Sequence, residues 1–153
     1  MITSILDSNL SSCAGVEILL GMFPSDLSNH VLNSLLDLGC KVYPAKTPED
    51  AINKLQFHSF PITILEENYS MQIMQLMACL PMVIRRNIFY MVIGSNLETG
   101  NMMQSFILSA NFIVNYADLQ SFGQIFQAAL LNYNHFYRPF QNASEKISQG
   151  RGN

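Results

Sequence analysis

The chain is 153 residues long, with 49% hydrophobic and 12% charged residues and a formal net charge of −3 at pH 7. This size and composition predict one globular domain with a sizeable core, and the slight acidity argues against nucleic acid as a partner. No apolar run is long enough to span a membrane, the first fifteen residues lack the features of a secretion signal, and Cys13, Cys40 and Cys79 show no paired spacing, so we expect free thiols in the cytoplasm.

Short apolar runs alternate with amphipathic stretches from the first third of the chain onward. Val16–Met22 is expected to form a buried strand. Ser25 is placed to cap a helix that ends at Gly39, the residue type that favours a helix C-terminus. Lys41–Ala45 is expected to form a second strand, at an edge of the sheet because it contains Pro44.

The middle of the chain continues the alternation. Thr47 followed by Pro48 marks the start of a second helix. The next elements are expected to be a third strand, a Met-rich helix, a solvated turn and a fourth strand that is apolar throughout, at Pro61–Glu66, Ser70–Leu80, Arg85-Arg86 and Ile88–Gly94 respectively.

The last third is expected to hold a short helix, a fifth strand and a long helix. These lie at Asn101–Ser109, at Asn111–Asn115, and from a cap at Asp118 as far as Tyr137. Five strands alternating with five helices predict a parallel sheet covered on both faces. We expect the folded domain at residues 15–140, between loose ends at 1–14 and 141–153.

Residues 39–67, GCKVYPAKTPEDAINKLQFHSFPITILEE, resemble without a gap the second-to-third-strand stretch of response-regulator receiver domains. Pro24 lies where receivers often have a proline, and Ser109-Ala110-Asn111 resembles their small-residue step before the fifth strand. The resemblance covers about Val16 to Leu131. It implies a flavodoxin-like α/β fold, with a five-stranded parallel sheet of order 2-1-3-4-5 and, here, an extended C-terminal helix.

The resemblance also implies where phosphoryl chemistry would lie, and this sequence departs from the family there. The acid pair that holds Mg²⁺ falls on Gly21 and Met22, and the phosphoacceptor aspartate on Glu66. The hydroxyl and lysine positions fall on Gly94 and Tyr116. Because losing one electrostatic donor costs roughly 10²–10³ in rate, we expect no enzyme activity, no metal and no cofactor. The expected function is a phosphorylation-independent signalling and protein-interaction module, a pseudo-receiver.

Two interpretations of Glu66 stay open. It could imitate a phosphorylated aspartate, or it could be a solvated carboxylate at a strand end. The second is favoured, because mimicry needs the hydroxyl and lysine partners that the chain lacks. Without a nearby cation, partial burial is expected to raise the pKa of this carboxyl group.

A candidate interaction surface follows from the resemblance, which implies binding through the fourth helix, fifth strand and fifth helix. Met103 and Ile107 lie four residues apart, where receivers usually expose polar groups, and Tyr116 lies close by. Phe106 is placed in the core. The surface would bind a protein partner or a second copy, unless the chain itself covers Met103 and Ile107.

The last helix carries an apolar seam with heptad-like spacing, made of Phe126, Leu130, Tyr133, Tyr137 and Phe140. It continues past the point where a receiver's last helix stops. We expect the seam to be buried against the domain's own core or in a homodimer, so Tyr133 and Tyr137 join the candidate interaction surface.

The alternative function is a flavodoxin-like domain that binds a small ligand or nucleotide at the C-terminal ends of the strands. The stretch from Gly21 to Asn29 lacks the Gly, Ser and Thr content of a phosphate-binding loop, and Asp26 would repel a phosphate. The interaction module is therefore preferred, with neither nucleic acid nor membrane as a partner.

Overall fold

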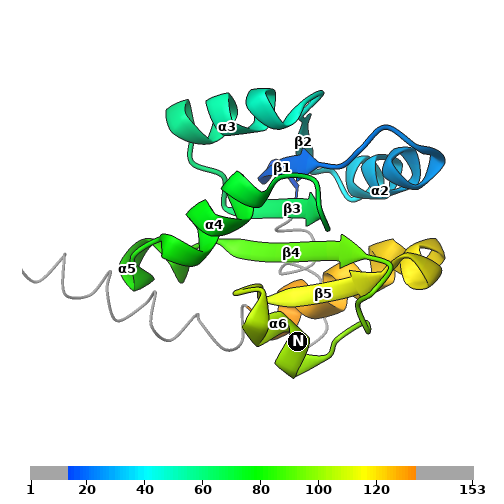
Figure 1. Ribbon diagram of the computed structural model, residues 1–153. Helices are drawn as coiled ribbons and strands as arrows, with labels where there is room; N and C mark the ends of the chain where they lie inside the picture. The colour runs from blue at the N-terminus through cyan, green and yellow to red at the C-terminus, as the bar shows by residue number, and fades with distance from the viewer. Residues whose placement is uncertain (1–13, 134–153) are drawn as a thin grey trace, which may run out of the picture.

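The computed structural model of the chain describes residues 14–133. Its strands are β1 (Glu17–Gly21), β2 (Lys41–Pro44), β3 (Ile62–Glu66), β4 (Phe89–Gly94) and β5 (Phe112–Asn115). Its helices are α2 (Asp26–Asp37), α3 (Pro48–Phe57), α4 (Met71–Cys79), α5 (Met82–Arg85), α6 (Met102–Ile107) and the 3₁₀ helix η1 (Tyr116–Ser121). Residues 122–133 form the last described helix, drawn in orange in Figure 1.

The five strands form one parallel sheet in the order β2-β1-β3-β4-β5, as the resemblance implied. Helix α2 and the last described helix cover one face, and α3 and α4 cover the other (Figure 1). This is the expected flavodoxin-like α/β fold. In such a sheet the C-terminal ends of the strands meet at one edge, where function is usually located.

Local signals in the sequence explain where the first helices begin and end. The Ser25 hydroxyl accepts a hydrogen bond from the Ser28 backbone N–H at 3.2 Å, which caps α2. The Thr47 hydroxyl caps α3 in the same way, with Pro48 as its first residue. Gly39 has a φ of +82°, the left-handed backbone that a glycine adopts easily after a helix.

The core is richest where β4 meets the last described helix. All six residues of β4 are buried. The Phe89 ring packs edge-on against the rings of Phe126 and Tyr133, with centroids 6.2 and 5.3 Å away. The predicted seam of the last helix, as far as Tyr133, is thus buried in the domain's own core. Tyr137 and Phe140 lie outside the described residues, as do nearly all of the predicted loose ends.

Two expected local features are wrong. Asp118 does not cap the last helix, because η1 comes first and the Asn115 side chain caps it by accepting from the Ala117 N–H at 2.8 Å. Arg85 is not in a solvated turn. It ends α5, and its guanidinium donates to the carbonyls of Ile88 and Ser109, at 2.7 Å each.

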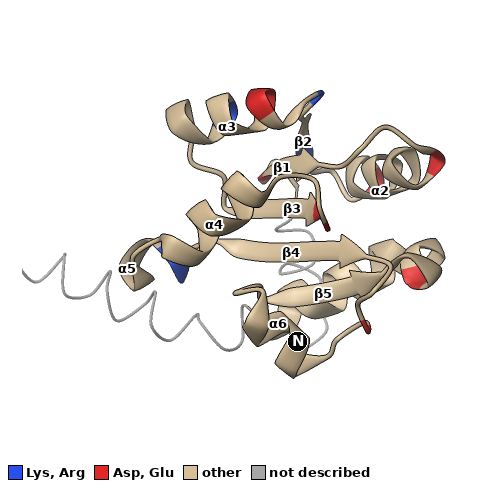
Figure 2. Ribbon diagram, viewed as in Figure 1, with Lys and Arg blue, Asp and Glu red and all other residues tan. Residues whose placement is uncertain are grey.

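Charged residues are sparse along the described ribbon, and the region of α6, β5 and the last described helix holds very few (Figure 2). Within residues 14–133, none of the helices combines the length and apolar character needed to cross a bilayer. Cys79 is an exposed free thiol and Cys40 is buried. Cys13 lies outside the described residues.

Candidate functional site

The fold brings the five positions singled out in the sequence to one edge of the sheet. Gly21 ends β1, Glu66 ends β3 and Gly94 ends β4. Met22 directly follows β1, and Tyr116 directly follows β5. This group of residues at the strand ends is called the corner below.

Glu66 is a half-buried carboxylate whose pKa is influenced by neutral hydrogen-bond donors and by burial. Burial raises its pKa above the ordinary value, and the Tyr116 hydroxyl and the Phe23 backbone N–H, which favour the charged form, oppose that rise. No positively charged side chain in residues 14–133 contributes to this shift. The direction is the one expected for a carboxylate without a cation.

Tyr116 supplies a phenol where the resemblance implied an ammonium group. Burial raises its pKa to about 12, and the negative charge of Glu66 acts in the same direction. The phenol therefore stays protonated at neutral pH. It can donate a hydrogen bond, but it brings no positive charge to the corner.

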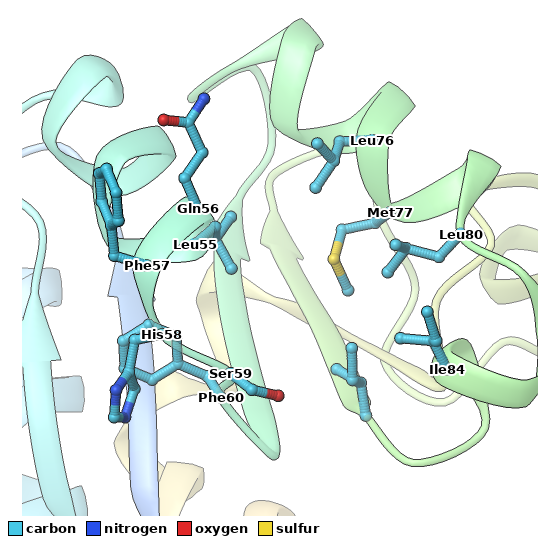
Figure 3. A pocket seen from close by; sticks show the side chains of 11 residues that line it. Leu55, Gln56, Phe57, His58, Ser59, Phe60, Leu76, Met77, Leu80 and Ile84 are labelled. Carbon is cyan, nitrogen blue, oxygen red and sulfur yellow. The ribbon is translucent and has the colours of Figure 1, made fainter.

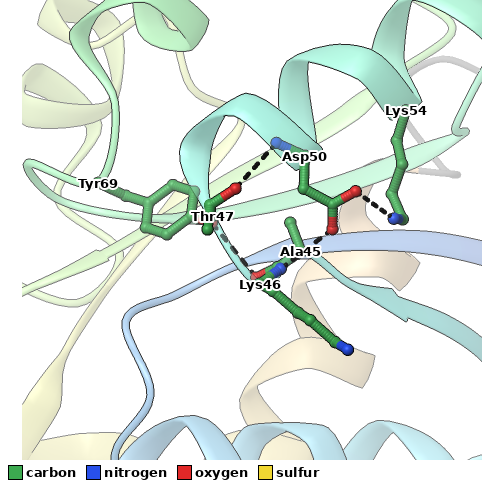
Figure 4. A network of polar contacts seen from close by, with 6 residues as sticks. All are labelled: Ala45, Lys46, Thr47, Asp50, Lys54 and Tyr69. Carbon is green, nitrogen blue, oxygen red and sulfur yellow. Dashed lines mark hydrogen bonds and ion pairs between the residues drawn. The ribbon is translucent and has the colours of Figure 1, made fainter.

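The space beside Gly21 is filled. A β-carbon added there would lie 2.7 Å from Leu65 Cδ2 and 3.0 Å from Tyr69 Cε1. The Tyr69 ring packs against Phe23, and its hydroxyl donates to the Ala45 carbonyl at 3.3 Å, at the start of the α3 polar network in Figure 4. An acidic side chain has no room at this position.

The other two positions are closed as well. Met22 is buried in the core on the α2 side of the sheet. At Gly94, an added β-carbon would lie 2.7 Å from the Glu67 β-carbon, so the Glu67 side chain covers the end of β4. A hydroxyl-bearing side chain would collide with it.

A magnesium ion, which the receiver resemblance implies for this corner, does not fit these residues. Oxygen-rich ligand sets hold that ion, often with two carboxylates. Here Gly21 and Met22 offer no side-chain oxygen, so the corner has only the carboxylates of Glu66, whose pKa is raised, and of Glu67, which covers the end of β4. Within residues 14–133, no three His, Cys, Asp or Glu side chains lie close enough together to hold a metal ion.

The second candidate feature, on α6, is a row of exposed apolar side chains. Met103 and Ile107 are 68% and 70% exposed, as expected for an interaction surface. Phe106 was expected in the core but is 81% exposed, and Met102 is 86% exposed. These four side chains are called the α6 face. None of the helix's own residues is buried.

The three tyrosines of the predicted interaction surface do not share the exposure of Met103 and Ile107. Tyr133 is buried, and its hydroxyl donates to the Arg86 carbonyl at 2.6 Å, so it belongs to the core and not to a surface. Tyr116 is half-buried at the corner, and Tyr137 lies outside the described residues.

Two grooves lie away from the corner. One, of about 510 Å³, runs between α6 and the last helix and reaches Phe89 and Phe112, the first residues of β4 and β5. The other, of about 350 Å³, lies between the C-terminal ends of α3 and α4 near the start of β3 (Figure 3). Phe57 and His58 form one wall, and Leu76 and Leu80 the other. Both grooves are near the N-terminal ends of strands.

Sequence reasoning missed the side chains that hold the loop between β4 and α6. Asn115 and Gln104 make several of its hydrogen bonds. An asparagine directly after an apolar strand was the available signal, but its partners are carbonyl groups that no sequence pattern marks.

No family model matches the chain, and no curated protein matches it significantly. Solved structures do. HP1043, an orphan response regulator of H. pylori, has a TM-score of 0.58 at 14% identity, covering 75% of this chain and 96% of its own. A fusion protein with a trimeric coiled-coil segment of yeast Spc42 has a TM-score of 0.62 at 17% identity, covering 92% of this chain and 93% of its own. At these identities the likeness shows the fold alone: the chain has a receiver-like, flavodoxin-like α/β fold.

Proposed function

We propose that this chain is a pseudo-receiver, a non-enzymatic signalling module of the cytoplasm that binds protein without being phosphorylated. The corner supports the first part of the proposal. Phosphoryl transfer needs a metal and a cation to stabilise the charge that develops on the phosphoryl oxygens. The corner instead combines the carboxylate of Glu66 with the neutral phenol of Tyr116.

The α6 face is the observation that carries the interaction role. Burying a large apolar side chain contributes about 1.5–3 kcal/mol, so four exposed together on one short helix leave considerable free energy unused. Contiguous apolar patches of this kind mark binding surfaces in soluble proteins. The proposed partner is another protein or a second copy of this chain, bound through α6, β5 and the last helix.

A phosphorylation assay tests the corner. The purified chain is incubated with Mg²⁺ and acetyl phosphate, and its intact mass is measured. We expect no gain in mass, because nothing at the corner stabilises an incoming phosphoryl group. A covalent phosphate on Glu66 would contradict the proposal.

Charge placed on the α6 face tests the interaction. The variant Met103→Lys/Ile107→Lys is compared with Val83→Lys, which puts the same charge on an exposed apolar position of α5. Mass is followed against concentration by sedimentation, and chemical cross-linking in the native host identifies bound partners. We expect the double variant to lose self-association or the cross-linked partner and the control to keep it. Equal behaviour of the two variants would exclude the α6 face.

A further inference from the structure

None of the residues of helix α6 is buried, and polar contacts make much of its attachment to the domain, beside the packing of Leu108 at its C-terminal end. Its half-buried inward residues include Gln104 and Ser105. The Gln104 side chain accepts from the Glu98 N–H at 2.7 Å and donates to the Asn96 carbonyl at 3.3 Å. These bonds tie the helix to the loop that precedes it, residues 95–101.

Asn115 ties the same loop to the end of β5. Its side-chain amide donates to the Leu97 carbonyl at 2.6 Å and to the Ser95 carbonyl at 3.2 Å. Its backbone N–H donates to the Thr99 hydroxyl at 2.9 Å, and that hydroxyl donates to Asp118 at 2.5 Å. The bonds made by Asn115, Thr99 and Gln104 are called the polar clamp.

The groove of about 510 Å³ lies beside the α6 face. Met102 and Phe106 stand at its rim, and Phe89, Phe112, Ala129 and Tyr133 form much of its wall. Apolar side chains next to an apolar hollow gain free energy by filling it, because doing so removes both surfaces from water. A rotation of α6 about its own axis would allow this, yet Met102 and Phe106 remain 86% and 81% exposed.

We infer that the polar clamp fixes the rotation of α6, and that Asn115 is the positioning residue that keeps the α6 face turned outward. The bonds from Asn115 fasten the preceding loop at Ser95, Leu97 and Thr99, so a turn of the helix that moves this loop must break them. The geometric part of this inference is independent of any partner. Its biological use, presenting the α6 face, rests on the proposed function.

Oxidation of methionine by hydrogen peroxide tests this inference, because the rate follows the exposure of the sulfur atom. Met102 reports on α6, and Met71, which is 69% exposed on α4, is the internal reference. In Asn115→Ala, α6 is free to turn its apolar side chains into the groove. We expect the oxidation rate of Met102 to fall several-fold relative to Met71, measured by peptide mass spectrometry.

Two further variants separate positioning from stability. Asn115→Asp keeps an acceptor for the Ala117 N–H but loses both donors to the loop, so we expect it to behave like Asn115→Ala. Asn87→Ala removes a comparable bond, from the Asn87 amide to the Val83 carbonyl at 3.1 Å. That control is expected to leave the ratio of Met102 to Met71 oxidation unchanged.

The oxidation ratios of the Asn115 variants decide whether Asn115 positions α6. An unchanged ratio in both Asn115 variants overturns the inference, and so does faster oxidation of Met102, which would show that the bonds only stabilise the fold. If circular dichroism shows that the Asn115 variants do not fold, Gln104→Ala takes their place with the same expected ratio. Because the assay needs no partner, its failure leaves the lysine test of the α6 face unaffected.

Discussion

At the residue scale, the corner holds the acidic side chains of Glu66 and Glu67, and no positively charged side chain in residues 14–133 contributes to the pKa of Glu66. Glu66 is half-buried, and its nearest polar groups are the Tyr116 phenol and the Phe23 amide. Neutral donors of this kind offset part of the cost of burying a charge but do not remove it. The charged form of Glu66 therefore destabilises the folded state slightly.

This destabilisation gives a prediction for the stability of Glu66→Gln at different pH values. The pKa of Glu66 in the folded chain lies above its ordinary value of 4.5, so the folded chain keeps the proton at pH values where the unfolded chain has lost it. Stability is therefore lost as pH rises from 4.5 through the raised pKa. At pH 7 we expect the variant to be more stable than the original, by less than about 1 kcal/mol because water screens the site.

Urea denaturation of the original chain and the variant at pH 7 and at pH 4 measures the difference in their free energies of unfolding. The other titrating groups are the same in both proteins, so their contributions cancel in this difference. The advantage of the variant is expected to shrink at pH 4, where Glu66 is largely protonated in both states. A variant that is less stable at pH 7 would mean that the charged carboxylate is stabilised, contrary to the direction of its pKa.

Packing over Gly21 gives a second prediction. In Gly21→Ala the new methyl group meets Leu65 and Tyr69, so we expect a loss of about 1–3 kcal/mol in the free energy of unfolding. The matched control is Gly123→Ala in the last described helix, where nothing lies within 4 Å of the added carbon. It is expected to gain about 0.4–1 kcal/mol. Equal effects in thermal or urea unfolding would contradict the filled space at Gly21.

The sequence predicts which residues stand at the corner, because strand ends follow from apolar runs and their spacing. It does not predict what surrounds them. Leu65 and Tyr69 come from β3 and the following loop, and their contact with Gly21 depends on the register of two strands. The interaction of Glu66 with Tyr116 likewise joins residues fifty positions apart in the chain.

At the scale of elements, α6 and the last described helix are opposites. Both are uncharged and apolar, but the last helix turns its aromatic side chains into the core and α6 turns Phe106 to solvent. Sequence patterns find the apolar side of a helix without showing which way it faces. For α6 the inward side is chosen by the polar clamp, so the core position expected for Phe106 was wrong.

This contrast predicts that truncating a phenylalanine to alanine costs much more stability in the last helix than in α6. Phe126→Ala removes a fully buried ring and is expected to cost about 3–5 kcal/mol of stability. Phe106→Ala is expected to change stability by less than about 0.5 kcal/mol, as exposed substitutions usually do. Urea unfolding at one pH measures both. A large loss in Phe106→Ala would show that its ring is covered in solution by another copy or another part of the chain.

The elements themselves were largely predictable, and the exceptions are short. Strand positions, the caps of α2 and α3 and the Met-rich α4 follow from local chemistry. Helix α5 has four residues and η1 has six, and neither is long enough to show a helical period in the sequence. Their ends are set by tertiary bonds, such as that from Arg85 to Ser109.

At the scale of the whole molecule, charge is unevenly distributed. Asp118 is the one charged residue between positions 99 and 133, a stretch that includes α6, β5 and most of the last helix. The other charged residues in the part of the chain that the structure describes lie on other elements and loops (Figure 2). A partner that binds this region therefore gains little from ion pairs, and apolar contact supplies most of the free energy.

The association is accordingly expected to resist salt. Raising the salt concentration from about 0.01 to about 1 M shortens the Debye length from about 30 to about 3 Å and weakens charged interfaces. For binding through the α6 face we expect a dissociation constant that stays the same or falls over this range. Sedimentation or light scattering in both buffers measures it. Marked weakening by salt would point to a charged surface elsewhere on the domain.

The packing over Gly21 also limits which substitutions the chain can accept there. A single base change turns any glycine codon into one for aspartate or glutamate, but the new side chain would meet Leu65 and Tyr69 and would gain nothing until both had changed too. Selection removes such intermediates, since they are less stable and do no more than their parent. An acidic side chain at this position would therefore need compensating changes at Leu65 and Tyr69 in the same step.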